Sequence, residues 1–176
     1  LLAALPGKRL LHFAPEPCLE AQFRRIPGLD YLSADLYNPR AMQQMDITRL
    51  PLPDDSFDFI FCSHVLEHVA DDRQALAELH RVLHPGGQAL LLVPLEGKVT
   101  DEDPTITDPL ARERRFGQFD HLRRYGMDFT DRIQAAGFTV HLLHGDALGL
   151  SPADLTRLGL ETGEILFSGH KPPTRF

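Results

Sequence analysis

The sequence has 176 residues, of which 43% are hydrophobic and 24% charged, and its formal net charge is −7. This size and composition are typical of one globular domain, and the acidic balance argues against nucleic acid as a partner. No apolar run approaches the roughly 18 residues of a membrane span. The chain has two cysteines, Cys18 and Cys62, in unrelated surroundings. They predict neither a disulfide nor a zinc framework, and we expect a cytoplasmic protein without membrane contact.

Strand and helix patterns alternate along the chain. The apolar start, residues 1–5, is typical of the end of a helix, so we expect a truncated N-terminus. The expected strands are 9–13, 31–34, 41–47, 57–62, 89–93, 138–143 and 164–168. The expected helices are 19–25, a segment capped by Asp71 and ended by Pro85-Gly86-Gly87, residues 128–136 before Gly137, and a short one begun by Ser151-Pro152 in an insertion over 146–163.

This alternation predicts an α/β fold: a doubly wound, Rossmann-like, mostly parallel sheet with an antiparallel strand near the C-terminus. We expect residues 1–176 to form a single domain. Ligands of such sheets bind at the carboxyl ends of the strands, here after residues 13, 34, 47, 62 and 93. Residues 96–126 are polar and irregular, a length that is often functional.

The segment Leu50–Pro94 carries the strongest motif. It reads LPLPDDSFDFIFCSHVLEHVADDRQALAELHRVLHPGGQALLLVP. This resembles the middle of the class I S-adenosylmethionine-dependent methyltransferases of the small-molecule, type 11-like kind: "LP", "sFD" and an apolar strand, then "LEH", "RvLkPGG" and another apolar strand. The resemblance implies S-adenosylmethionine as cofactor and methyl transfer to an unidentified small molecule.

Two carboxylates match the cofactor positions of this family. Asp35 ends the second strand, about twenty residues past the first, where an acceptor for ribose hydroxyls is expected. Asp46, followed by Ile47, matches the adenine-contact position. The alternatives are a turn residue for Asp35, before Asn38-Pro39, and a surface carboxylate for Asp46.

The first loop departs from the family pattern of an acidic residue and spaced glycines. The acidic position is His12, and the glycine positions become Ala14, Glu16 and Cys18. We expect Phe13, Ala14 and Glu16 to contact the cofactor nevertheless. Our hypothesis is that the Glu16 carboxylate lies near the ammonium of the methionine part. The alternative is an acid favoured by the helix dipole.

Other polar residues are candidates for catalysis and substrate binding. Ser63 and His64 follow the fourth strand and are expected to face the cofactor, with His64 the second candidate for a general base. The segment RFGQFDHLRRYG (115–126) resembles a recurrent substrate-cover segment of these enzymes, so residues 95–126 are expected to cover the substrate. His121 is the first candidate base. Arg115, Arg123 and Tyr125 are expected to orient the substrate, although His121 and Tyr125 are equally consistent with anchoring the loop.

Three alternatives remain open. The altered first loop is also consistent with a degenerate, non-catalytic methyltransferase-fold scaffold. A nicotinamide-dependent oxidoreductase is less favoured because G-x-G-x-x-G is missing after the first strand. His64–His68 satisfies the H-x-x-E-H zinc pattern, but Ala70-Asp71-Asp72 interrupts the helix that such a site needs, so we expect no metal. The oligomeric state is not indicated.

Overall fold

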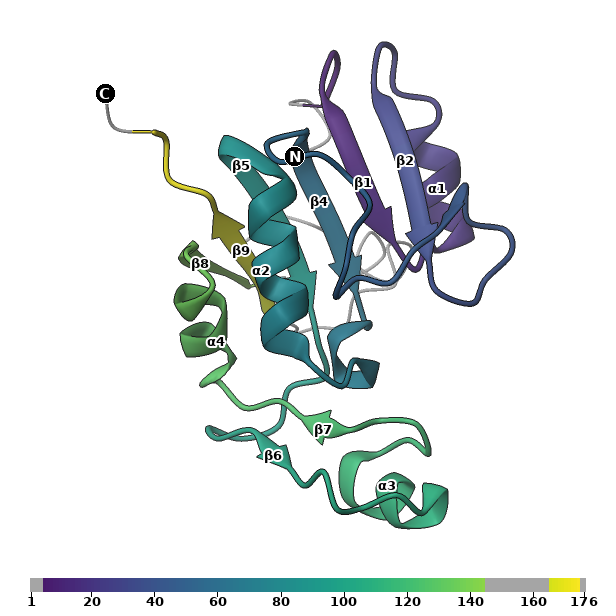
Figure 1. Ribbon diagram of the computed structural model, residues 1–176, viewed down its shortest axis with the longest axis vertical. Coiled ribbons are helices and arrows are strands. Elements are labelled where there is room, and N and C mark those ends of the chain that lie inside the picture. Colours follow the sequence, from purple (N-terminus) through teal and green to yellow (C-terminus); the bar gives the residue numbers. More distant parts are fainter. Residues whose placement is uncertain (1–4, 145–164, 175–176) are drawn as a thin grey trace.

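The computed structural model describes residues 5–144 and 165–174. Within them, a seven-stranded sheet has the order β3-β2-β1-β4-β5-β9-β8 (Figure 1). Its strands are β1 (Arg9–Phe13), β2 (Asp30–Asp35), β3 (Gln43–Gln44), β4 (Phe57–Ser63), β5 (Leu83–Leu92), β8 (Thr139–His144) and β9 (Ile165–His170). The pairs from β3 to β5 are parallel, and β9 is antiparallel to both β5 and β8. This confirms the predicted mostly parallel sheet with an antiparallel strand near the C-terminus.

Helices cover both faces of this sheet, as a doubly wound fold requires. The covering helices are α1 (Pro17–Phe23) on one face and α2 (Asp72–Val82) and α4 (Phe129–Ala135) on the other. The 3-10 turn η2 (Leu66–His68) and α3 (Pro109–Phe116) lie beyond the carboxyl edge of the sheet. Successive residues of β1 face opposite sides. Leu11 belongs to the main core with Leu76 of α2 and Ile133 of α4, whereas Leu10 packs with Phe23 of α1 in a smaller core on the other face. Among the described helices, none has the length and apolar character that crossing a bilayer requires.

The boundary between α2 and β5 differs from the prediction. Asp71 caps α2 as expected, because its side chain accepts a hydrogen bond from the Gln74 amide. The helix already ends at Val82, however, and β5 begins at Leu83, before the Pro-Gly-Gly sequence. Leu83 pairs with Phe57, and the register shifts before the next pair, so residues 84–87 form a bulge. Gly87 is required there, since a Cβ would lie 3.0 Å from the Asp58 carbonyl oxygen.

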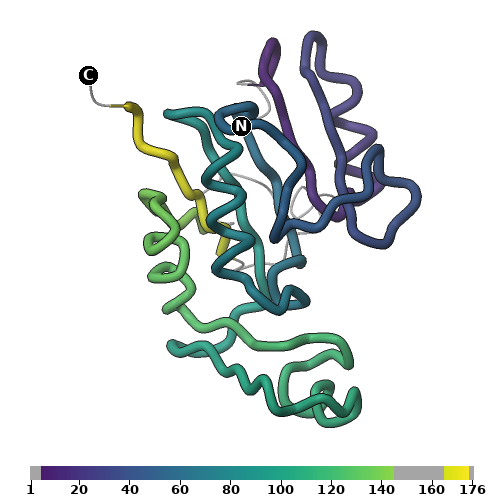
Figure 2. Tube along the Cα trace, in the orientation of Figure 1, coloured from purple at the N-terminus to yellow at the C-terminus, as the bar shows by residue number. Residues whose placement is uncertain are grey.

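Residues 95–126, which we call the 95–126 segment, are more regular than predicted. They contain α3 and a two-stranded antiparallel sheet of β6 (Asp101–Glu102) and β7 (Arg123–Arg124). Figure 2 shows the chain leaving β5, running through this segment and returning to α4. In Figure 1 the segment lies below the arrowheads of β1, β2, β4 and β5, at the carboxyl edge of the sheet.

The remaining boundaries shift by a few residues. Helix α1 begins at Pro17, since proline suits the first helical position, and only 43–44 of the predicted third strand are paired. Gly137 follows α4 with a φ of +103°, which agrees with its predicted role as the end of that helix. The start of the chain (1–4) and the predicted insertion at 146–163 with its Ser151-Pro152 helix lie outside the described residues.

Candidate functional site

The carboxyl ends of three neighbouring strands form the candidate site. Phe13 of β1 pairs with Ala34 of β2 on one side and with Cys62 of β4 on the other. The residues that follow these pairs therefore emerge at one edge of the sheet. The predicted site residues among them are Ala14, Asp35, Ser63 and His64. This is the edge at which parallel α/β sheets bind ligands.

The backbone adopts a left-handed conformation at two of these strand ends. Ala14 has a φ of +48° and His64 a φ of +51°, values that residues other than glycine seldom adopt. Each is held by a backbone bond to the adjoining strand, from Ala14 N to Ala34 O at 3.0 Å and from His64 N to Leu92 O at 3.0 Å. Such conformations cluster at functional sites, where the surrounding fold sustains their cost.

The first loop is organised by a hydrogen-bonded chain that sequence reasoning missed. His12 is fully buried, with its Nε2 2.8 Å from Glu16 Oε2 and its Nδ1 3.0 Å from the Tyr31 hydroxyl. A carboxylate only accepts, so Nε2 carries a proton and donates it to Glu16. Nδ1 is hydrogen-bonded to the Tyr31 hydroxyl. The signal in the sequence was His12 at the position where the family pattern has an acid, with an acid, Glu16, four residues downstream.

The charges in this loop are set by burial and by these bonds. Burial raises the pKa of Tyr31 to about 12, with the nearby Glu20 carboxylate adding to the effect, so the phenol stays neutral. Burial also acts to raise the pKa of Glu16, but hydrogen bonds from His12, from its own backbone amide and from Ser63 outweigh it. The pKa of Glu16 therefore lies below its ordinary value, and the side chain is an anion that remains 36% exposed.

Asp35 and Asp46 are held by their own turns. Asp35 Oδ1 accepts hydrogen bonds from the amides of Tyr37 and Asn38, both at 2.7 Å. Asp46 Oδ1 accepts from the amide and the hydroxyl of Thr48, which lower the pKa of Asp46. In both cases the described bonds end on Oδ1, so Oδ2 is the oxygen that a ligand would meet.

Two predicted cofactor contacts point into the protein. The side chains of Phe13 and Ile47 are buried in the main core, at 2% and 6% exposure. Phe13 and Ile47 are next to Ala14 and Asp46 in the chain. Their backbone atoms therefore lie at the candidate edge, while their side chains pack in the core beneath it.

The predicted substrate residues have different environments. Arg115 is exposed on α3 and pairs with Asp101 and Asp103. Arg123 is 5% exposed and donates to the carbonyl oxygens of Leu66, Val69 and Ala70 and to Glu102. Arg115 is thus exposed but paired with two carboxylates, whereas Arg123 faces the body of the protein. Its role toward a substrate stays a prediction.

Tyr125 anchors the 95–126 segment through Asp72, which no sequence pattern marked as a functional residue. The Tyr125 side chain is fully buried, and its hydroxyl lies 2.7 Å from Asp72 Oδ2 and 3.2 Å from Leu66 O. Burial and the Asp72 charge raise the pKa of Tyr125. Asp72 also accepts from Arg132 at 2.7 Å. This network favours the anchoring interpretation of Tyr125.

The two candidate bases lie on either side of Glu67. His64 has a half-exposed side chain, with Nδ1 3.3 Å from Glu67 Oε1. His121 is 8% exposed, its Nδ1 is 3.1 Å from the Phe116 carbonyl oxygen, and its ring contacts that of His68 at a centroid distance of 4.7 Å. His64 therefore faces the open edge, whereas the His121 side chain is buried between its own 95–126 segment and His68 of η2. Catalysis by either stays a prediction.

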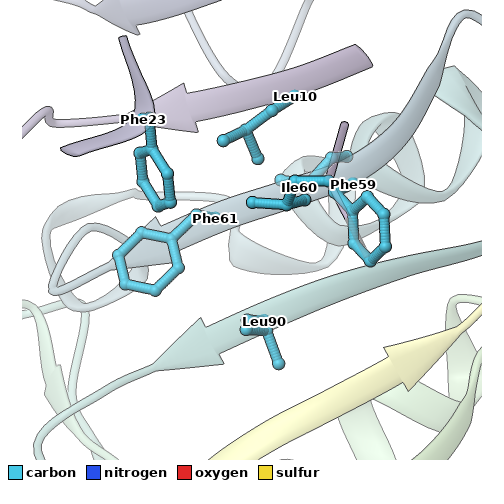
Figure 3. Close-up of a pocket in the computed structure, with 7 residues that line it drawn as sticks. Leu10, Phe23, Phe59, Ile60, Phe61 and Leu90 are labelled. Carbon is cyan, nitrogen blue, oxygen red and sulfur yellow. The ribbon is translucent and has the colours of Figure 1, made fainter. Parts of the chain in front are cut away.

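A hollow on the α1 face of the sheet is chemically unsuited to be this site. Figure 3 shows its lining of apolar side chains, among them Leu10, Phe23, Phe61 and Leu90. A cofactor with charged and hydroxyl groups needs convergent polar partners, and the seven lining residues supply no polar side chain. The carboxyl edge remains the candidate site.

Comparisons with known proteins agree with this geometry. A family model described as "Methyltransferase domain" matches residues 18–91. A relative in Mycolicibacterium smegmatis, named "Probable S-adenosylmethionine-dependent methyltransferase", is 31% identical over 135 residues, which are 71% of this chain and 49% of the relative. The chain spans about half or less of the length of the curated relatives that it matches first.

Solved structures share the fold at low sequence identity. The YcgJ protein of Bacillus subtilis superposes with a TM-score of 0.66 and 21% identity, over 98% of this chain and 95% of that one. A Burkholderia thailandensis 1,6-didemethyltoxoflavin-N1-methyltransferase gives a TM-score of 0.68 and 15% identity, over 97% and 76% of the two chains. That structure holds 1,6-didemethyltoxoflavin and S-adenosylhomocysteine.

Proposed function

This chain belongs to the class I S-adenosylmethionine-dependent methyltransferases, and from that premise we propose that it transfers a methyl group to a small-molecule acceptor. These matches confirm the family predicted from the sequence. Methyl transfer and S-adenosylmethionine as cofactor are properties of that family, and for this chain methyl transfer is the proposal. The observation that carries the proposal for this chain is the gathering of Ala14, Glu16, Asp35 and Ser63 at one edge of adjoining parallel strands.

The polar groups at this edge match those of the cofactor. The carboxylate of Asp35, at the tip of β2, has Oδ2 directed away from its turn bonds and suits the ribose hydroxyls. The ionised Glu16 suits the ammonium of the methionine part. The left-handed Ala14 retains, with only a methyl side chain, the turn for which the family uses glycine. Asp46 is exposed beside these groups and suits the adenine amine.

The protein's part in the reaction is alignment and exclusion of water. When bound, the cofactor supplies an activated methyl group on its sulfonium. Ser63 and His64, at the end of β4, are the residues proposed to orient the donor end, with His64 as a proton acceptor on the exposed side. The 95–126 segment is proposed to cover the acceptor, since it lies at the same edge and presents Arg115.

A small molecule is the acceptor class that we propose. The Burkholderia neighbour acts on a compound of this class by its printed name, and the net charge of −7 disfavours nucleic acid. The competing function is a scaffold without catalysis, which the proline-rich first loop favours. Cofactor binding separates the two.

Asp35→Asn tests the cofactor site. Asparagine retains an oxygen for the turn but presents an amide donor where the ribose needs an acceptor, so the dissociation constant for S-adenosylhomocysteine should rise. A lost hydrogen bond to a charged group is worth about 1.5–3 kcal/mol, or roughly 10- to 100-fold in affinity. Isothermal titration calorimetry of the purified chain measures this.

Asp30→Asn is the matched control. Asp30 begins the same strand at the opposite edge, where it pairs with Arg9 at 2.8 Å, and its change should leave the affinity unaltered. Equal losses in both variants would point to a general charge effect. If the unaltered chain binds neither S-adenosylhomocysteine nor S-adenosylmethionine at millimolar concentration, the scaffold is correct and the proposed enzyme is not.

A further inference from the structure

We propose that Glu67, His68 and His121 form a binding site for a divalent transition-metal ion, which fastens the 95–126 segment to the turn after β4. Each residue offers one ligand atom, and the three atoms lie within 4.8 Å of one another. An ion bound at about 2.0–2.2 Å separates its ligand atoms by roughly 3–4 Å. Small side-chain rotations therefore suffice to close the site. This inference does not depend on the cofactor.

The Glu67 carboxylate is the independent reason to expect a ligand. Its side chain is 1% exposed, and neither oxygen has a hydrogen-bond partner in the part of the chain that is described. Buried carboxylates are normally paired, hydrogen-bonded or bound to a metal, because burying an uncompensated charge is costly. Oε1 lies 3.3 Å from His64 Nδ1 in an ion-pair contact. One carboxylate oxygen of Glu67 also lies within 4.8 Å of a ring nitrogen of His68 and of His121, as expected of a metal ligand.

Both imidazoles are oriented as metal-binding histidines usually are. His121 Nδ1 lies 3.1 Å from the Phe116 carbonyl oxygen, so it donates its proton there and leaves the lone pair on Nε2. His68 Nδ1 lies 3.3 Å from Asp120 Oδ2, which directs its Nε2 away from that carboxylate. Ligating histidines typically bind a carbonyl or carboxylate through the second nitrogen, and this fixes the tautomer and the ring orientation.

The donor set indicates which ion is bound. Two imidazoles and one carboxylate suit zinc and its first-row neighbours, whereas magnesium and calcium prefer oxygen ligands alone. Glu67 and Asp120 together supply the two negative charges that balance a divalent ion. Three protein ligands also leave a coordination position open, as catalytic zinc sites do.

The site would join two parts of the chain that already touch. Glu67 and His68 belong to η2, and His121 belongs to the 95–126 segment. The Leu122 amide donates to the Glu67 carbonyl at 2.9 Å, so the backbones are in register beside the three side chains. The H-x-x-E-H motif therefore contributes Glu67 and His68 to a site completed by His121, 53 residues downstream, and not by a shared helix.

Zinc titration of the full chain without an affinity tag tests the proposal. After treatment with a chelator, calorimetry should show one equivalent of zinc bound, and elemental analysis should show it retained after gel filtration. Cobalt should give the visible absorption of a low-coordinate site. Zinc should also raise the melting temperature, since free ion at a hundredfold excess over its dissociation constant raises the folding equilibrium constant about hundredfold.

Variants assign the ligands. Glu67→Gln and His121→Ala should abolish stoichiometric binding, and Asp120→Asn should weaken it by about 10- to 100-fold through loss of ring orientation. His141→Ala is the matched control, because His141 and His170 form another T-shaped pair at 5.2 Å on β8 and β9. That variant should bind zinc like the unaltered chain.

Circular dichroism melts show whether each variant is folded. Should Glu67→Gln or His121→Ala fail to fold, His68→Ala, at a side chain 31% exposed, gives the same test. Absence of binding by the unaltered chain, or binding that survives His68→Ala in folded protein, would overturn the proposal. Binding of S-adenosylhomocysteine by the chelator-treated chain is measured separately, so failure here leaves the proposed function standing.

Discussion

The carboxyl edge of β1, β2 and β4 and the anchor around Asp72 use the same residue types in opposite ways. At the edge, Asp35 and Asp46 are held by their own turns: Asp35 bonds amides two and three residues away, and Asp46 bonds Thr48. At the anchor, Asp72 bonds Arg132 and Tyr125, which are 60 and 53 residues away. The Asp72 side chain is 4% exposed, whereas the edge carboxylates face solvent in part or in full.

This difference indicates which charges are available to a ligand. A turn orients a carboxylate without enclosing it, so its second oxygen remains accessible. The long-range network buries Asp72, Arg123 and Arg132. Removal of one member leaves the charges of the others buried without compensation and makes no new group accessible to a ligand. Changes at the edge should therefore act on ligand affinity, and changes at the anchor on stability.

Asp72→Ala should have the largest effect on stability. It removes the carboxylate that Arg132 and the Tyr125 hydroxyl share, and leaves them only Glu102 and the Leu66 carbonyl oxygen as acceptors. Loss of one partner of a buried ion pair costs about 3–5 kcal/mol. Chemical denaturation should show this loss in the free energy of unfolding. Hydrogen exchange should show the earliest loss of protection in 95–126.

Asp101→Ala sharpens the same test. Asp101 also pairs with an arginine, Arg115 at 2.7 Å, but both side chains are at least 40% exposed. The cost should stay below about 1 kcal/mol, as for other surface pairs. Similar costs for Asp72→Ala and Asp101→Ala would contradict the distinction between a buried anchor and a solvated pair.

Local sequence patterns were sufficient to predict the sheet and the edge at which the candidate site lies. Apolar runs such as FDFIFC specify strands buried on both faces, and the parallel register then brings their ends to one edge whatever the loops contain. This is why the sequence alone predicts that Asp35 and Ser63 lie beside Ala14. The bulge at 84–87 was missed because Pro-Gly-Gly usually ends an element, whereas here β5 starts before it.

Contacts between distant segments could not be predicted in this way. His121 was expected either to act as a base near the substrate or to anchor its loop, because its segment resembles a substrate cover. Its position beside Glu67 depends on how the 95–126 segment docks. That docking needs Gly126, where a Cβ would lie 2.4 Å from Val99 N, and the buried Arg123 and Tyr125. Polar residues such as Arg123 are mostly exposed in folded proteins. No hydrophobic periodicity in the sequence therefore predicts that these side chains are buried.

Glu16→Gln tests the expectation for the carboxyl edge, because it should change mainly the affinity for the cofactor. Removal of its charge takes away the proposed partner of the cofactor's ammonium, in a position 36% exposed to solvent. A partly exposed ion pair is worth about 1 kcal/mol or less, so the dissociation constant should rise roughly up to fivefold. Calorimetry with S-adenosylhomocysteine measures this.

The control is Glu20→Gln, one turn further along α1, where the carboxylate pairs with Arg24 at 2.7 Å. It should leave the affinity unaltered. A large fall in stability with unchanged affinity in Glu16→Gln would instead make the His12–Glu16 pair an anchor like Asp72.

The smallest expected effect concerns the pH dependence of stability: Glu102 should make the 95–126 segment less stable in acid. A hydrogen bond from Arg132 lowers the pKa of Glu102, burial opposes this, and Arg123 adds to the lowering. Because the folded pKa lies below the unfolded value of about 4.3, the stabilisation is full above that pH and is lost as the pH falls through the folded pKa. The side chain is 40% exposed, so solvent screening limits the contribution to below about 1 kcal/mol.

Glu102→Gln should therefore make the loss of stability below about pH 4.3 shallower, as measured by urea unfolding at a series of pH values. Glu113→Gln, at an exposed site on α3, controls for the loss of one negative charge. If Glu102→Gln and Glu113→Gln have the same pH profile, the arginines around Glu102 contribute no charge-dependent stability. The anchor would then consist of Asp72 and its direct partners alone. Asp72 would be the one buried carboxylate of the anchor to set against the solvent-facing carboxylates of the edge.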